Sequence, residues 1–266
     1  MTSMSTTTAT ATDGYGIEHV PGPWECTGES WWFTCHPLIG KRIIHAGSIN
    51  PLDFNPGVND GFDGGPGLIM IVRYSDTPVG PYDELLYIPG YYTTPHAPSS
   101  RCRITNIYVS SKETIYNGRR NWNIPKHLAV FSFDSSTETG RTRITVAHPE
   151  SPESPFFAAV VANIPLLSRV PVPLSTSLSP LNLECHQPEL RAVEGERGRE
   201  NGETATTTWR SFLPWMGGKV RFVKCVEMKN GNGDGSWPDK VDGVWSLVLR
   251  WDPGMKLKFP VGKEFV

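Results

Sequence analysis

The sequence predicts a mainly β fold of the β-rich α+β class, with about nine or ten strands and a few short helices in one domain spanning residues 17–266. Turn-forming residues are the first reason: 24 prolines and 26 glycines favour short elements over long helices. The second reason is a series of short apolar runs, each bounded by glycine, proline, asparagine or aspartate. No internal repeat of fixed period is found. The strand count alone does not choose between a barrel and a sandwich.

The amino-terminal third supplies the first strands. Residues 1–16 are mostly threonine, serine and alanine, and we expect a disordered arm because they cannot bury enough apolar surface. The Trp-Trp-Phe run at 31–33 predicts a core strand, and residues 41–44 a short strand or helical turn. The runs 68–74 and 85–88 are apolar without alternation, which predicts strands covered on both faces.

The middle third is expected to hold a strand, a short helix and a hairpin. Residues 101–109 alternate imperfectly and predict a strand of the same sheet. Ser110 suits an N-cap, so we expect a short helix that ends at the turn signal of residues 117–118. Residues 127–133 and 141–147 predict a β-hairpin with a long loop.

The last third adds strands and a polar excursion. Residues 187–205 are charged and almost without large apolar side chains, which predicts an exposed loop. Two further strands are expected over 218–228 and 244–251. The tail 255–266 alternates lysine with apolar residues and predicts an edge strand.

Composition limits the partners and the compartment. The net charge of −2 and the pI of about 6.4 give no nucleic-acid footprint. Residues 1–13 lack a basic, apolar leader, and runs such as 156–162 are too short to span a bilayer. Five scattered cysteines favour a reduced, cytoplasmic protein, and the seven histidines show no metal-ligand spacing. We therefore expect no membrane or nucleic-acid partner, no metal and no cofactor; a homo-oligomer is compatible with the sequence.

The most informative stretch runs from Gly118 to His127 and leads into an apolar strand. Pro125 fixes its own backbone and keeps the residue before it extended, so Lys126 stands at the mouth of a buried strand. Burial disfavours the charged form of a lysine, and the free amine is a nucleophile. Two alternatives remain open: the side chain reaches solvent along the sheet, or its ammonium pairs with an acid such as Glu84.

Two sequence blocks resemble the acetoacetate decarboxylase family. Residues 80–84 read Gly-Pro-Tyr-Asp-Glu, similar to the family's Gly-x-Tyr-x-Glu segment, which ends on an active-site glutamate. Gly-Arg at 118–119, then five residues, then Pro125-Lys126 is similar to the segment that carries the family's Schiff-base lysine. The resemblance implies a double-layered, cone-like β-barrel with a small-molecule substrate. It also implies that Lys126 is the nucleophile and that Glu84 handles protons.

Five more residues are candidates for supporting or substrate-binding roles: Arg119, His127, Tyr82, Trp122 and Met70. Arg119 suits a substrate carboxylate, or anchors the turn through backbone carbonyls. The chain departs from the decarboxylases at three places: His127 replaces a second lysine, residues 28–29 lack an arginine, and an apolar residue at 69–70 replaces an acid. These changes predict a larger, less polar pocket and a bulkier ketone.

Three functions remain open from the sequence. The leading hypothesis is a cofactor-independent lyase that uses the lysine on a β-keto or enone substrate, polyketide-like in character, by decarboxylation or aldol-type dehydration. The alternative is a natural-product cyclase or isomerase, pericyclase-like, that folds an apolar ligand in the barrel without covalent catalysis. The third is a ligand-binding barrel without catalysis.

Overall fold

The structure is a computed structural model that describes residues 15–35, 44–55, 57–58, 60–136 and 138–265. The predictions for residues 1–14 and 41–43 lie outside these residues. The strands are β1 (Trp24–Cys35), β2 (Phe62–Gly64), β3 (Gly67–Asp76), β4 (Tyr82–Ile88), β5 (Tyr91–Tyr92), β6 (Arg101–Cys102), β7 (Asn106–Val109), β8 (Lys126–Leu128), β9 (Val130–Ser136), β10 (Arg141–Ala147), β11 (Phe157–Asn163), β12 (Val172–Ser175), β13 (Cys185–Gln187), β14 (Trp209–Phe212), β15 (Trp215–Asn230), β16 (Val244–Phe259) and β17 (Lys263–Phe265). The helices are η1 (Pro51–Asp53), α1 (Lys112–Trp122), η2 (Leu167–Arg169), η3 (Thr176–Leu178) and α2 (Glu196–Asn201).

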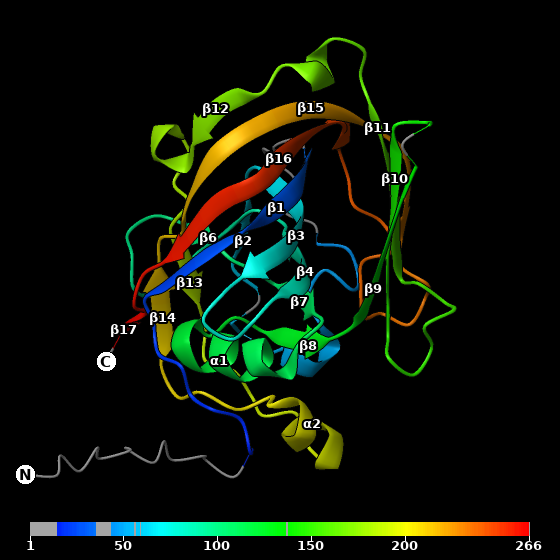
Figure 1. Cartoon of the computed structure of the whole chain (residues 1–266). Helices are drawn as coiled ribbons and strands as arrows, with labels where there is room; N and C mark the ends of the chain where they lie inside the picture. Colours follow the sequence, from blue (N-terminus) through cyan, green and yellow to red (C-terminus); the bar gives the residue numbers. More distant parts are fainter. Residues whose placement is uncertain (1–14, 36–43, 56, 59, 137, 266) are drawn as a thin grey trace, which may run out of the picture.

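The larger sheet bends almost into a closed ring (Figure 1). Its strand order is β8-β7-β4-β3-β1-β16-β15-β11-β10-β9, with β12 added beside β15. The two ends of this path, β8 and β9, are neighbours in sequence, separated by Ala129 alone. One residue therefore links the first edge of the sheet to the last, and the predicted barrel-like, strand-rich fold is confirmed.

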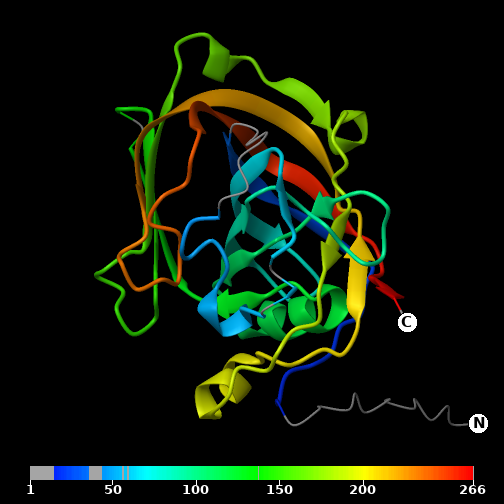
Figure 2. The same ribbon diagram turned by 180° about the vertical axis from the view of Figure 1, so that it is seen from behind.

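A smaller sheet forms a second layer. Its order is β17-β14-β13-β6-β5-β2, and it lies with α1 over one face of the larger sheet. Seen from behind, the segment that holds β14 and α2 (yellow) passes beside α1 (green) (Figure 2). This second layer encloses one face of β3 and β4, where the candidate site lies.

The continuous apolar run of β3 is explained by two separate cores. Met70, Val72 and Tyr74 belong to the core between the two sheets and α1. Ile69 and Ile71 point to the other face and belong to the core inside the ring of the larger sheet. Successive residues of a strand alternate between faces, so a strand buried on both sides needs apolar residues at every position.

Two strand predictions require correction. The predicted strand over 101–109 is broken, because β6 pairs in the smaller sheet and β7 in the larger one. The predicted edge strand of the tail is wrong for residues 255–259, which continue β16 between β1 and β15. The alternation of this stretch places Met255 and Leu257 in the core and the intervening lysines outside.

Two polar segments also differ from prediction. Residues 117–118 lie inside α1, which starts after Ser111 and continues to Trp122, so the predicted turn is absent there. Residues 187–205 are not simply an exposed loop: they contain α2 and bury Leu190 and Glu203. Their polar groups are satisfied by contacts with α1 and β8, which explains how so charged a segment is partly buried. Within the described residues, no helix is long and apolar enough to cross a membrane.

Candidate active site

The end of α1 determines where Lys126 lies. Asn123 caps the helix in the left-handed region, with φ of 54°. Two backbone amides fold back onto the helix. That of Asn123 donates to the carbonyl of Arg119 at 2.9 Å, and that of Ile124 donates to the carbonyl of Gly118 at 3.2 Å. Pro125 then prevents the helix from continuing, and the chain enters β8, which runs parallel to β7. This reversal places the lysine against the underside of the helix that precedes it.

The Lys126 ammonium is enclosed and fully hydrogen-bonded. Its Nζ donates to Glu84 Oε2 at 2.9 Å, to Thr114 Oγ1 at 2.8 Å and to the Tyr82 hydroxyl at 3.3 Å. An ammonium has three hydrogens, and three oxygens accept them. The lysine and glutamate side chains are 4% and 3% exposed. Of the two alternatives for this lysine, solvent exposure and pairing with Glu84, the structure has the second.

Two tyrosines complete the surroundings of Glu84. The Tyr74 hydroxyl donates to Glu84 Oε1 at 3.3 Å, and the Tyr74 and Tyr82 rings lie 4.5 Å apart. Burial, together with the nearby Glu84 carboxylate, raises the pKa of both phenols well above the usual value. Both phenols therefore remain protonated near neutral pH and can donate hydrogen bonds to a carboxylate or a ligand oxygen.

Gly118 gives the lysine its room. A Cβ atom at this position would lie 2.7 and 2.8 Å from Cδ and Cε of Lys126, closer than carbon atoms pack. Thr114 and Gly118 are four residues apart and share one face of α1. Thr114 thus supplies a hydrogen-bond acceptor for the Lys126 amine, and Gly118, one turn later, leaves space for the methylene groups of the same side chain.

Replacing Gly118 by alanine is expected to destabilise the protein by about 1–3 kcal/mol, because the added methyl group displaces the lysine stem. At an exposed glycine inside a helix, the same substitution would instead stabilise the protein by about 1 kcal/mol. Urea unfolding measures the difference. The control Lys112→Ala, at the first residue of the same helix, should change stability by less than about 0.5 kcal/mol. A stabilised Gly118→Ala variant would contradict the packing.

His127 and Arg119 belong to a different network. His127 follows Lys126 on β8 and faces the opposite side, where Nε2 lies 2.6 Å from Asp53 Oδ2 and Nδ1 lies 2.8 Å from Glu203 Oε1. Arg119 is fully buried, with both terminal nitrogens 3.2 Å from Asp53 Oδ1. It also donates to the carbonyls of Thr204 and Arg191. These contacts match the anchoring alternative for Arg119, not a substrate carboxylate, and neither residue contacts the Lys126 amine.

Charge explains why this network tolerates burial. Burial alone would lower the pKa of His127, but the carboxylates of Asp53 and Glu203 raise it above its ordinary value. Burial likewise works to raise the pKa of Asp53, and Arg119 and His127 together lower it. The two carboxylates therefore favour the charged form of the His127 ring, and the three side chains link η1, β8 and the segment after α2.

A small apolar cavity touches the carboxylate of the pair. Its volume is about 50 Å³, and Met70, Tyr74, Glu84, Leu86, Ile107 and Ile124 are among the residues that line it. Glu84 is the only charged side chain in the lining. The carboxylate, with the lysine directly behind it, is thus the polar end of an apolar space.

The remaining predicted residues have separate positions. Tyr82 contacts the lysine and Met70 lines the inner cavity. Trp122 is buried in the core, where its Nε1 donates to the carbonyl of Pro260 at 2.7 Å, and it does not line that cavity. Sequence reasoning missed Thr114 and Tyr74, although helical spacing from Gly118 and cross-strand pairing with Tyr82 carried the signal. Asp53 and Glu203 had no local signal.

A metal site was also sought. Within the part of the chain that the structure describes, no group of three or more histidine, cysteine, aspartate or glutamate side chains is arranged to hold a metal ion.

Comparisons with solved structures identify the class of fold. Acetoacetate decarboxylase from Legionella pneumophila subsp. pneumophila str. Philadelphia 1 superimposes with a TM-score of 0.58 and 11% identity, over 92% of this chain and 88% of the other. The enduracididine biosynthesis enzyme MppR, with HEPES bound, gives 0.54 and 12% identity, over 92% and 88%. The chain thus has the acetoacetate decarboxylase-like fold. The fold that the two sequence blocks implied is therefore confirmed.

The comparisons of sequence cover less of the chain than the comparisons of structure do. No family model matches the chain. The rice (Oryza sativa subsp. japonica) protein NEOXANTHIN-DEFICIENT 1 is 36% identical over 127 residues. That match covers 47% of this chain and 37% of the rice protein, so the chain aligns with little more than a third of its relative's length.

Proposed function

We propose that this protein is an enzyme that acts on a carbonyl compound through a Schiff base on Lys126, with Glu84 transferring the protons. The observation that supports it is the enclosed amine, 2.9 Å from an equally enclosed carboxylate that faces an apolar cavity. The two acetoacetate decarboxylase-like proteins compared above are themselves enzymes, which is in keeping with a catalytic role.

The proposed reaction starts with a proton transfer. Glu84 takes one proton from the ammonium, which frees the nitrogen lone pair to attack the substrate carbonyl carbon. The new C–N bond forms, the oxygen leaves as water after protonation, and an iminium cation remains. That cation accepts the electron pair released when a β-carboxylate departs as carbon dioxide or when an α-proton is removed. The enamine formed in this way takes up a proton at carbon from the protonated Glu84 carboxyl, and hydrolysis of the resulting iminium then returns the amine and the product.

The substrate class follows from the lining. The cavity offers one carboxylate and the protonated phenol of Tyr74 among apolar side chains, so it suits a neutral ketone or enone better than a small charged keto acid. Decarboxylation requires a carboxylate on the substrate, so this lining favours aldol-type dehydration of a neutral β-keto or enone compound of polyketide-like character. Tyr74 is the phenol that lines the cavity and can donate to the carbonyl oxygen, whereas Tyr82 contacts the lysine.

Isotope exchange tests the covalent step. In water labelled with heavy oxygen, the protein should exchange the carbonyl oxygen of acetone, because iminium formation expels the original oxygen and hydrolysis introduces a solvent oxygen. Lys126→Met should lower the exchange rate at least about a hundredfold, while the control Lys112→Met should leave it unchanged. Wild-type protein that gives no exchange with any ketone would contradict the proposal.

A second candidate is a cyclase or isomerase in which Glu84 acts alone as acid and base. The observation in its favour is that Glu84 lines the cavity, while Lys126 is held behind it by three acceptors. The same labelled solvent separates the two. Exchange of α-hydrogens without exchange of the carbonyl oxygen, lost in Glu84→Gln and kept in Lys126→Met, would select this second function.

A further inference from the structure

We propose that an apolar vestibule outside the inner cavity binds the chain of an elongated, uncharged substrate whose carbonyl end reaches Glu84 and Lys126. This rests on the proposed function and names its substrate class. The vestibule is a pocket of about 330 Å³ between β1, β3, β16 and the segment around β12.

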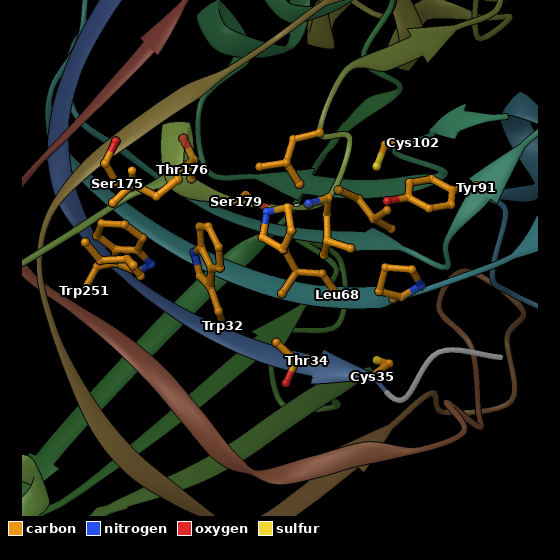
Figure 3. A pocket seen from close by; sticks show the side chains of 18 residues that line it. Trp32, Thr34, Cys35, Leu68, Tyr91, Cys102, Ser175, Thr176, Ser179 and Trp251 are labelled. Atoms are coloured by element: carbon orange, nitrogen blue, oxygen red, sulfur yellow. Dashed lines mark hydrogen bonds between the residues drawn. The ribbon is translucent and has the colours of Figure 1, made fainter. Parts of the chain in front are cut away.

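The walls of the vestibule are apolar. Trp32 and Trp251 lie side by side at one end, with ring centroids 5.2 Å apart, and Tyr91 and Cys102 lie at the other (Figure 3). Leu68 lies between them on β3. None of the described side chains that line this pocket carries a charge; serine, threonine, tyrosine, cysteine and tryptophan supply its polar atoms. Such a surface favours hydrocarbon over a charged or heavily hydroxylated ligand.

The vestibule and the inner cavity follow one another along the same strand face. Leu68 lines the vestibule, and Met70 and Tyr74 line the inner cavity, at alternate positions of β3. On β4, Ile88 lines both spaces and Glu84 lines the inner one. Ile88 therefore stands between the two spaces, and rotation of its half-buried side chain would join them into one path.

The register of the two strands fixes the order along this path. Leu68 is paired with Ile88, Met70 with Leu86, and Val72 with Glu84. Each step of two residues moves toward the lysine–glutamate pair on the same face. From position 68 to position 72, which is level with Glu84, the path covers four residues, or about 13 Å at the rise of an extended strand. A short keto acid would fill only its inner end.

The outer rim continues the apolar surface. Leu178 and Leu181 line the vestibule and remain 79% and 46% exposed. A ligand chain that leaves the vestibule along these two residues therefore meets leucine side chains before it meets bulk water. The path thus consists of an apolar rim, an apolar vestibule and a polar end, which matches a molecule with a long hydrocarbon chain and one terminal carbonyl group.

A series of methyl ketones tests this inference on the full chain. Acetone, methyl hexyl ketone and methyl undecyl ketone share one carbonyl group and differ only in chain length. Quenching of tryptophan fluorescence measures affinity, because Trp32 and Trp251 line the vestibule. We expect methyl undecyl ketone to bind at least about tenfold more tightly than methyl hexyl ketone, since each additional methylene is buried against apolar walls.

Two positions on β12 provide a matched pair of variants. Leu174 lines the vestibule and Val172, on the same strand, does not. Leu174→Ser should weaken methyl undecyl ketone about tenfold, whereas Val172→Ser should leave its affinity unchanged. Leu178→Ser, at a largely exposed rim position, is a second vestibule variant that does not disturb the core and should also weaken binding.

The outcomes separate this inference from the proposed function. Equal affinity for the two longer ketones, or vestibule variants that bind methyl undecyl ketone as wild type does, would overturn the inference even if acetone exchanges its oxygen. Chain-length-dependent binding that Leu174→Ser weakens would support the vestibule even if no ketone exchanges oxygen, and in that case only the covalent function fails.

Discussion

Lys126→Met is expected to lower the free energy of unfolding by about 3–5 kcal/mol, because it leaves the Glu84 carboxylate buried without its cation. Both side chains lie in the core between the sheets, and Glu84 keeps only the Tyr74 hydroxyl as a donor. The carboxylate must then either remain charged in an apolar site or take up a proton. Urea unfolding near neutral pH measures the loss.

A double variant shows whether the loss comes from the unpaired charge. Lys126→Met/Glu84→Leu removes both charges and is expected to recover most of the stability, since well-packed apolar residues often replace a buried ion pair at little cost. The interaction between the two substitutions should therefore be large and favourable. A Lys126→Met variant as stable as wild type, or a double variant with the summed loss of both single variants, would contradict a buried ion pair.

The second large effect is expected at His127, where substitution by alanine should lower the free energy of unfolding by about 3–5 kcal/mol below neutral pH. Removing the ring leaves the carboxylates of Asp53 and Glu203 facing each other across the vacated site, and of these two carboxylates Arg119 is bonded only to that of Asp53. Denaturation curves recorded over a range of pH measure both the loss and its pH dependence.

The sign of the pH dependence follows from the two pKa shifts. The raised pKa of His127 means that the folded state holds the proton more tightly, so its contribution to stability is complete below about 6.5 and is lost as the pH rises through the raised pKa. The lowered pKa of Asp53 acts in the other direction, supplying stability above about 3.8 that is lost as the pH falls through the lowered pKa.

As the pH rises above about 6.5, the free energy of unfolding of His127→Gln should therefore decline less steeply than that of wild type. The control His96→Gln, at an exposed ring, should leave the decline as in wild type. A His127→Gln variant whose stability depends on pH as wild type does would show that another group causes the decline.

Sequence patterns predicted the elements whose evidence is local. The uninterrupted apolar run of residues 68–74 correctly indicated a strand buried on both faces, and of the two alternatives left open for Lys126 the structure has the pairing with Glu84. Strand periodicity, in contrast, argues against His127 as a supporting residue of the Lys126 site, because neighbours on a strand point to opposite faces.

Other features depend on contacts between distant segments. Asp53 reaches His127 from η1, and Glu203 reaches it from a segment that composition alone assigned to solvent. The helical position of Gly118 likewise reflects the lysine packed on it, which a local Asn-Gly turn signal does not record. The long strands β15 and β16 exceed their apolar runs because pairing on both sides supports the polar positions in between.

Borohydride trapping followed by peptide mass mapping tests the covalent role of Lys126 most directly. Reduction of an iminium formed with acetone or a longer methyl ketone converts it to a stable secondary amine on the lysine. We predict one added alkyl group on the peptide that contains Lys126, and none in Lys126→Met/Glu84→Leu, which keeps its core filled but lacks the amine. No adduct with any ketone, or an adduct only on other lysines, would contradict the account.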